Sequence, residues 1–206
     1  MSNRSRATRE DTASLRTAAR GADAVVLTRG SGGDPRPDAQ ERIDHGGLRN
    51  LLTALDGARP RITLMTSLHA TRGDVPGHTP WKRRCERLLR ASGLPNTIVR
   101  PGWFDQAAPT RRRLVLHQGG RAGGAISSDQ LAETLVRTLL TDTTLNATFE
   151  LIAAEGEDPS PSDWTDLFAP LRSDTSGNPD GLLDPDDLPL EAEPARGLAD
   201  FDAIRP

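Results

Sequence analysis

The sequence predicts an α/β fold with a parallel sheet, and two observations support this. Four short apolar runs are bounded by turn residues and lack the apolar–polar alternation that marks a half-exposed strand. Segments with helical periodicity separate these runs, as expected for parallel strands joined by right-handed crossovers. The expected strands are residues 24–27, 62–65, 97–99 and 149–152.

The first two helices flank the first strand. Residues 13–20 form a short helix, which Gly21 ends. Residues 38–55 form a longer helix with its leucines largely on one face. Within it, Gly46 and Gly47 would let the helix approach a strand closely, because neither carries a side chain.

The third helix, at residues 80–92, has the clearest end signals. Thr79 suits the N-cap, Pro80 the first helical position and Gly93 the position just past the end. Its apolar face carries Trp81, Cys85, Leu88 and Leu89. We therefore interpret Cys85 as a buried small hydrophobe.

The last part of the chain changes in character. A fourth helix is expected at residues 129–140, with Ser128 as its cap, and a short fifth helix at 164–168. Beyond residue 154 the chain is acidic, rich in proline and poor in apolar residues, so we expect the remainder to be extended or loosely ordered. We therefore divide the chain into a domain at 1–154 and an acidic segment at 155–206, packed on the domain or trailing from it.

The net charge of −3 conceals an uneven distribution. Residues 155–206 carry 14 acidic and 3 basic residues, whereas residues 1–154 carry 15 acidic and 23 basic residues. A basic body with an acidic tail also suits nucleic-acid binding, but no aromatic residues interleave with the arginines, so we expect no nucleic-acid partner. We interpret the arginine clusters at 83–90 and 111–113 as solvated surface, with the acidic segment as their counter-charge.

Composition excludes several classes of protein. No apolar stretch approaches the roughly 20 residues of a membrane span, and no apolar segment follows the basic N-terminus as it would in a signal peptide. The single cysteine excludes an internal disulfide and fits a reducing, cytoplasmic location. The four histidines show no metal-ligand spacing with one another, with the cysteine or with nearby carboxylates, so we expect no metal site.

A continuous run at residues 81–103, WKRRCERLLRASGLPNTIVRPGW, carries a family resemblance. A lysine-bearing helix that leads into ASGL-x-x-TIVRPG resembles the helix-to-strand passage of atypical short-chain dehydrogenases/reductases, the NAD(P)-binding branch with NmrA-like proteins. Shorter matches at 13–26, 64–67 and 126–132 follow in the family's order, so the resemblance covers roughly residues 9–155. It implies a Rossmann-like, doubly wound parallel sheet that binds NAD(P).

The resemblance also implies where ligands bind, because ligands of a doubly wound sheet lie beyond the carboxyl ends of its strands. Lys82 would lie near the nicotinamide ribose. The implied cofactor-binding residues are Thr28, Gly30, Ser67, Lys82, Pro101 and Gly102. Trp103 and Phe104 would face the substrate, although Trp103 equally suits a rim or core position.

The expected catalytic residues are Lys82, Ser67 and His78. Classical enzymes of the family use a tyrosine four residues before the lysine, because the nearby ammonium lowers the pKa of the phenol. This sequence contains no tyrosine, and His78 occupies that position, where an imidazole can carry a proton. The alternatives are that His78 is an exposed loop residue and that Ser67 is a strand-end cap.

The chain departs from the family pattern at its start. The first βαβ unit, with the glycine-rich turn that holds the pyrophosphate, has no counterpart before residue 13. The glycine-rich stretches at 30–33 and 119–124 do not fit that turn, so we interpret them as flexible loops. We therefore expect an N-terminally truncated member whose Rossmann-like sheet lacks this unit and whose affinity for NAD(P) is weak or absent.

Several function hypotheses follow. The first is an NAD(P)-binding oxidoreductase that acts on an unknown small molecule. This protein would be inactive if the truncation removes its cofactor site. The alternatives are a non-catalytic, NmrA-like binding or regulatory protein, and a gene fragment. In a sheet without the earlier strands, residues 24–27 would form an exposed apolar edge, so we also expect self-association or aggregation through it.

Overall fold

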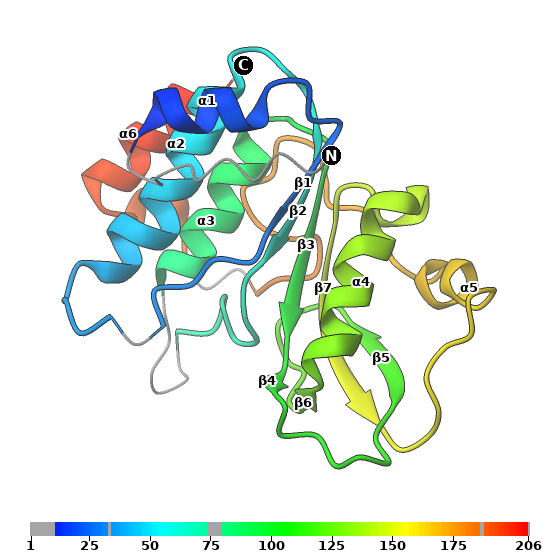
Figure 1. Ribbon diagram of the computed structural model, residues 1–206. Coiled ribbons are helices and arrows are strands. Elements are labelled where there is room, and N and C mark those ends of the chain that lie inside the picture. Colours follow the sequence, from blue (N-terminus) through cyan, green and yellow to red (C-terminus); the bar gives the residue numbers. More distant parts are fainter. Residues whose placement is uncertain (1–10, 33, 74–79, 186–187, 206) are drawn as a thin grey trace.

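The computed structural model describes residues 11–32, 34–73, 80–185 and 188–205. Its centre is a five-stranded sheet in the order β1 (Ala24–Leu27), β2 (Arg61–Met65), β3 (Asn96–Pro101), β7 (Ala147–Ala154) and β5 (Arg113–His117) (Figure 1). The first four strands are parallel, which confirms the predicted sheet, whereas β5 runs antiparallel to β7. A small parallel pair, β4 (Trp103–Phe104) and β6 (Ala125–Ile126), follows the carboxyl end of β3.

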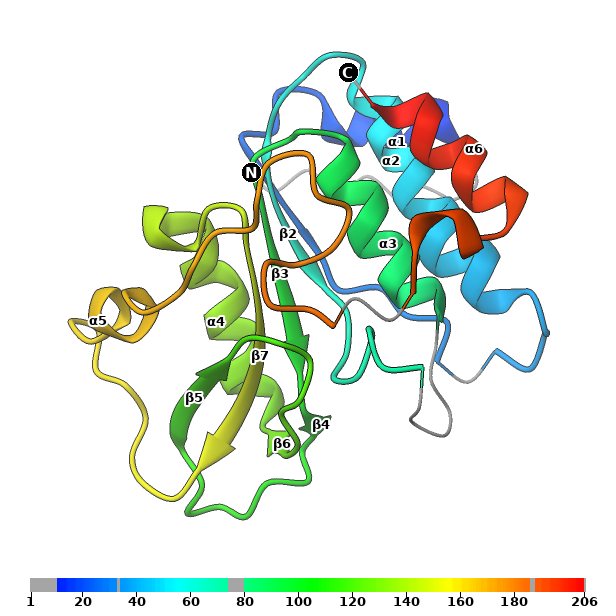
Figure 2. The ribbon, with the colours of Figure 1, turned by 180° about the vertical axis from the view of Figure 1, so that it is seen from behind.

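Helices cover both faces of the sheet, as the view from behind in Figure 2 also shows. The helices α1 (Thr12–Ala19), α2 (Gly46–Leu55) and α3 (Pro80–Ala91) lie on one face, and α4 (Ser128–Leu140) lies on the other. One apolar cluster joins α2 and α3 to β2 and β3. A second joins α4 and α5 (Trp164–Phe168) to β3, β5 and β7. Both layers are therefore closed by buried apolar side chains, and all five expected helices form.

The helix ends follow the predicted signals with one shift. Gly93, just past α3, has a φ of 63°, the left-handed conformation that favours glycine. The N-cap of α4 is Ser127 and not Ser128, which is already helical. The backbone N–H and hydroxyl of Ser128 both donate to the Asp105 carboxylate, at 2.8 and 2.7 Å. Asp105 therefore satisfies the first turn of α4 from outside the helix, a contact that local sequence does not reveal.

The second expected helix is not uniform. Its first turns form a π-helical segment, η1 (Gln40–His45), and the α-helix α2 begins only at Gly46. Gly47 makes room for the Arg29 guanidinium and not for a strand, since a β-carbon at this position would overlap that group. The predicted close approach therefore exists, but its partner is the side chain that follows β1.

The acidic segment is more ordered than its composition predicts. The helix α5 forms where expected, and the Phe168 ring lies 5.6 Å from Trp164 and 6.1 Å from Phe149. A short 3-10 turn, η3 (Leu190–Ala192), and a last helix, α6 (Ala195–Ile204), follow in this segment, and another 3-10 turn, η2 (Asp142–Thr144), precedes β7. The helix α6 was not predicted, because Phe201 is its one fully buried large apolar residue and gives little periodicity.

Residues 172–205, which we call the acidic strap, lie along α3 (Figure 2). Four of its carboxylates pair with five arginines of α3 and β3. The pairs are Arg90–Asp174 at 3.0 Å, Arg83–Asp180 at 3.1 Å, Arg87–Asp180 at 2.7 Å, Arg100–Asp184 at 2.6 Å, Arg84–Glu193 at 2.5 Å and Arg87–Glu193 at 2.6 Å. Arg83 and Arg87 are buried, so the solvated-surface interpretation of this cluster is wrong and the counter-charge interpretation is confirmed.

The strand β1 lies at one edge of the sheet, where a second copy of the chain could pair with it. In the described part of the chain it pairs with β2 alone, and Val26 is 37% exposed. Self-association through this edge and the absence of an earlier βαβ unit both stay predictions. No helix among the described ranges has the length and apolar character that crossing a bilayer requires.

His45, the last residue of η1, is buried beneath α6. Its ring lies 5.3 Å from that of Trp81, and its Nδ1 lies 3.6 Å from the Asp200 carboxylate of α6. Burial lowers the pKa of His45 from 6.5 to about 4, because the imidazolium would lose its hydration. The folded protein therefore binds this proton more weakly than the unfolded chain does.

We expect the free energy of unfolding to fall as the pH drops from 6.5 towards 4, since only the unfolded chain gains this proton in that window. Between pH 7.5 and 5.5 the loss from this group is about 1 kcal/mol. Urea unfolding at both pH values measures it in the wild type, in His45→Gln and in His117→Gln, an exposed-histidine control. His45→Gln should remove the loss and His117→Gln should keep it; equal losses in all three proteins would contradict the prediction.

Candidate functional site

The carboxyl ends of β1, β2 and β3 meet at one edge of the sheet, because the strands are parallel. The start of α3 brings Lys82 to this edge. Its ammonium donates to the Arg29 carbonyl oxygen at 3.1 Å and lies 3.4 Å from Asp44 Oδ2. A β-carbon on Gly30 would lie 3.8 Å from the same nitrogen. Lys82 and Gly30, which the sequence analysis assigned to one site, are therefore neighbours.

Asp44 is a buried carboxylate that the sequence analysis did not single out. Its Oδ2 accepts from the Ser31 hydroxyl at 3.3 Å and pairs with Lys82, while Oδ1 accepts no hydrogen bond from the described residues. A cavity of about 20 Å³ lies beside it and is lined by Arg29, Asp44, Thr66, Lys82, Cys85 and neighbouring apolar residues. This volume holds about one water molecule.

Cys85 adds no reactive group to this cavity. Burial raises the pKa of its thiol to about 12, because a thiolate would be desolvated there. The side chain is 3% exposed and belongs to the apolar cluster between α3 and the sheet. Its interpretation as a small buried hydrophobe is confirmed.

Arg100, at the end of β3, is buried among three carboxylates. It forms two hydrogen bonds with Glu86, at 3.0 and 2.6 Å, and two with Asp184, at 2.6 and 2.7 Å; a fifth reaches Glu150 at 3.3 Å. Thr66 also donates to Glu86, at 2.7 Å. Burial raises the pKa of Glu150. Burial alone would lower the pKa of Arg100, but the carboxylates of Glu86 and Asp184 hold that pKa well above its usual value. The network joins α3, β3, β7 and the acidic strap, so Arg100 acts as a structural cation.

The residues at the end of β3 and just beyond it form one buried pair and one exposed pair. Pro101 and Gly102 are buried, and a β-carbon on Gly102 would lie 2.5 Å from the Gly124 carbonyl oxygen. This crossing of two backbones requires glycine whether or not a ligand binds. Trp103 and Phe104 are 67% and 47% exposed, so they are accessible at the edge.

Of the three expected catalytic residues, the structure describes Lys82 and Ser67. His78 lies outside the described residues. Ser67 is half-buried at the end of β2, and in the part of the chain that the structure describes its hydroxyl forms no hydrogen bond with Lys82. Thr28 is exposed beside Arg29. Lys82 therefore contacts the end of β1, whereas Ser67 lies at the same edge of the sheet, after β2.

The polar residues that sequence reasoning missed are Asp44 and Glu86, together with the backbone of Arg29. Glu86 lies within residues 81–103, the run that carries the resemblance, so its position in that run could have marked it as a candidate. Asp44 stands in no motif, and its burial becomes visible only once η1 is packed against α3.

Comparison with known proteins places this geometry in context. The NAD(P)H-binding family matches residues 5–142. The uncharacterized sugar epimerase YhfK of Bacillus subtilis is 30% identical over 152 residues, which cover 70% of this chain and 69% of that protein. The chloroplastic protein TIC 62 of rice is 36% identical over 105 residues, and these cover 45% of this chain but only 21% of TIC 62.

A solved structure shares the fold. A putative NAD-dependent epimerase/dehydratase from Bacillus halodurans superposes with a TM-score of 0.65 at 22% identity, covering 79% of this chain and 75% of that one. This likeness confirms the Rossmann-like architecture, and the family match over residues 5–142 confirms the NAD(P)-binding family that the resemblance implied. The cytoplasmic location stays a prediction.

Proposed function

Because this chain belongs to the NAD(P)H-binding family, we propose that it is an oxidoreductase-family protein that binds NAD(P) at the carboxyl edge of its sheet and acts on a small molecule. The observation that carries the proposal is the position of Lys82, which contacts the end of β1 and a buried carboxylate at that edge. Ligands of doubly wound sheets bind there.

The described residues fit one part of a dinucleotide. Lys82 supplies a donor for ribose hydroxyls, and the free lone pairs of Asp44 Oδ1 suit a hydroxyl or a water. The phosphate part has no such support: within the described ranges, the glycines after β1 lead into turns and no helix begins on them. The neighbouring cavity of about 20 Å³ admits no nicotinamide ring without rearrangement. We therefore expect weak NAD(P) affinity for this chain.

Bound NAD(P) supplies hydride transfer in proteins of this kind. In the proposal, Lys82 holds the ribose, Thr28, Gly30, Pro101 and Gly102 border the cofactor, and Ser67 borders it and orients the substrate. Trp103 and Phe104 contact the substrate with their exposed rings. His78, at the tyrosine position of the classical enzymes, carries the proton.

A second candidate is a non-catalytic, NmrA-like binding or regulatory protein. Two observations favour it: the sequence has no tyrosine, and Asp44 already neutralises Lys82, which leaves the ammonium less able to lower the pKa of a neighbouring acid. The two candidates differ in whether NAD(P)H is oxidised, so a functional assay separates them.

Titration of the protein with NADPH, followed by nicotinamide fluorescence, tests the proposal. We expect saturable binding weaker than micromolar, further weakened in Lys82→Met and unchanged in Arg121→Gln, an exposed arginine control. Thermal unfolding of each variant checks that it is folded. Micromolar affinity for NADPH would overturn the expectation of weak binding. Binding of NADPH without its oxidation by any carbonyl substrate tried would favour the second candidate. The absence of saturable binding would overturn the site assignment.

A further inference from the structure

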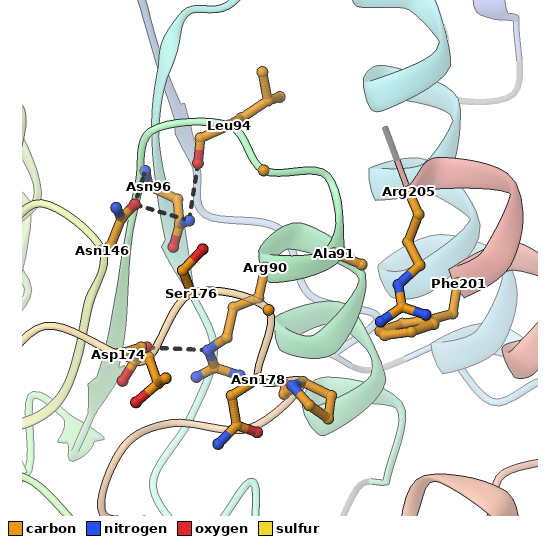
Figure 3. A pocket seen from close by; sticks show the side chains of 14 residues that line it. Arg90, Ala91, Leu94, Asn96, Asn146, Asp174, Ser176, Asn178, Phe201 and Arg205 are labelled. Carbon is orange, nitrogen blue, oxygen red and sulfur yellow. Dashed lines mark hydrogen bonds and ion pairs between the residues drawn. The ribbon is translucent and has the colours of Figure 1, made fainter.

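A pocket of about 510 Å³ lies at the last turn of α3 (Figure 3). Lys82 stands in the first turn of the same helix. Arg90 stands eight positions after Lys82, which is a rise of about 12 Å along the helix. Arg90 and Ala91, in the last turn of α3, line the pocket. Its other walls are the amino ends of β3 and β7, the strap turn at residues 174–179, and α6. The volume falls in the range of sites for small molecules.

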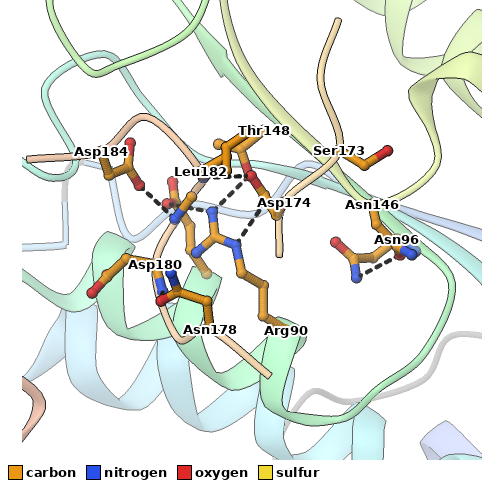
Figure 4. Close-up of polar contacts among 12 residues, drawn as sticks. Arg90, Asn96, Asn146, Thr148, Ser173, Asp174, Asn178, Asp180, Leu182 and Asp184 are labelled. Atoms are coloured by element: carbon orange, nitrogen blue, oxygen red, sulfur yellow. Dashed lines mark hydrogen bonds and ion pairs between the residues drawn. The ribbon is translucent and has the colours of Figure 1, made fainter. Parts of the chain in front are cut away.

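The strap turn is a firmly held wall of this pocket. Asp174 accepts hydrogen bonds from Arg90 at 3.0 Å, from Thr148 at 2.6 Å and from the backbone N–H of Leu182 at 2.9 Å (Figure 4). Its own N–H donates to the Asn146 carbonyl oxygen at 2.7 Å. These bonds fix the base of the turn to α3 and to β7, so the pocket is preformed, and the charges of Arg90 and Asp174 compensate each other.

The floor of the pocket carries an unsatisfied amide. Asn96 is 4% exposed, and its Nδ2 donates to the Leu94 carbonyl oxygen at 3.0 Å and to Asn146 Oδ1 at 3.4 Å. Its Oδ1 is buried and accepts no hydrogen bond from the described residues. The protein itself covers this acceptor, so a molecule in the pocket reaches it only if the floor shifts. Ser176 and Asn178, on the strap turn, add a further hydroxyl and amide.

The rim carries one positive charge without a described counter-ion. The Arg205 guanidinium lies 4.7 Å from the centre of the Phe201 ring, which orients it over α6 beside the pocket. Within the described residues no carboxylate reaches it at ion-pair distance. A planar guanidinium held this way suits a phosphate or carboxylate group.

We propose that this pocket binds a small hydroxylated anion, with its phosphate or carboxylate on Arg205 and its hydroxyls on Ser176 and Asn178 of the strap turn. The amides and the hydroxyl of the lining can each donate or accept, as recognition of hydroxyls requires. Within the described residues, one arginine of the lining has no carboxylate partner, which matches one anionic group. The site is separate from the carboxyl edge and does not depend on NAD(P).

Calorimetric titration of the full chain with four probes tests the proposal: glucose 6-phosphate, gluconate, glucose and inorganic phosphate. We expect glucose 6-phosphate or gluconate to bind, and which of them binds tells phosphate from carboxylate. Arg205→Gln should weaken that binding about tenfold, and Ser176→Ala by a smaller factor. Both side chains are exposed, so the variants should fold. Arg121→Gln, an exposed arginine in another loop, should bind like the wild type.

Three outcomes would overturn the proposal. The first is no saturable binding of either hydroxylated anion at 10 mM. The second is unchanged affinity in Arg205→Gln, or an equal loss in Arg121→Gln. The third is an affinity for glucose, or for inorganic phosphate, that equals the affinity for the hydroxylated anions. In that case either the anionic group or the hydroxyls would contribute nothing to binding. None of these results bears on NADPH binding at the other end of α3.

Discussion

Replacing Arg100 with methionine is expected to lower the free energy of unfolding by about 3–5 kcal/mol, since it leaves carboxylates buried without their cation. Glu86, Asp184 and Glu150 all lose their central partner, and each of their side chains is at most 2% exposed. Methionine approximates the length of the arginine stem, so the change tests charge more than packing. Urea unfolding followed by circular dichroism measures the difference.

The pH dependence of this variant separates lost charge from lost packing. Unpaired buried carboxylates have folded-state pKa values above their unfolded ones, so the destabilisation should shrink as the pH falls from 8 to 5. Arg137→Met, which removes a partly exposed pair with Glu133 on α4, is the control and should change stability by less than about 1 kcal/mol. A loss for Arg100→Met that is small, or that does not vary with pH, would contradict a structural role for this cation.

Replacing Arg87 with methionine should release the acidic strap while the sheet stays folded. Arg87 binds Asp180 with two hydrogen bonds, at 2.8 and 2.7 Å, and also binds Glu193 and the Leu188 carbonyl oxygen, both at 2.6 Å. Among the described residues, no other side chain forms hydrogen bonds to three separate points of the strap. Arg83 and Arg84 still hold Asp180 and Glu193, so we expect partial release, with the strap opening about 30- to 100-fold more often.

Hydrogen exchange measured by mass spectrometry resolves this outcome. Amides of residues 174–204 should exchange faster in Arg87→Met, while those of β7 keep their protection. Arg112→Met is the matched control, because Arg112 also bridges two carboxylates, Asp129 and Asp158, but on the exposed surface away from the strap. Unchanged exchange in the strap would show that its apolar contacts, chiefly Phe201, hold it without the ion pairs. Faster exchange throughout the chain would show that the strap and the sheet unfold together.

The elements that were predicted well are those whose signals are local. Buried parallel strands read as short continuous apolar runs, and α3 carries its own start and stop residues, so β1, β2, β3, β7 and the main helices follow from neighbouring residues. The antiparallel direction of β5 and the helix α6 carry no comparable signal. They depend on pairing with β7 and on docking against α3, which are contacts distant in sequence.

The site shows the same division. The resemblance run led to Lys82 and to the carboxyl edge, because the residues of that run are contiguous. Asp44 escaped notice, since a carboxylate in a polar helix looks solvent-exposed until tertiary packing buries it.

By itself, the sequence determined the α/β class, the family resemblance, and the charge excess that the acidic strap neutralises. Only the tertiary structure decided which charges meet. Arg100 finds Asp184 across 84 residues of chain, and the strap turn closes a pocket against β3 and β7 that no contiguous motif encodes. The physical reason is that apolar periodicity acts between neighbours in the chain. Buried ion pairs and cavities, in contrast, depend on where distant segments are packed.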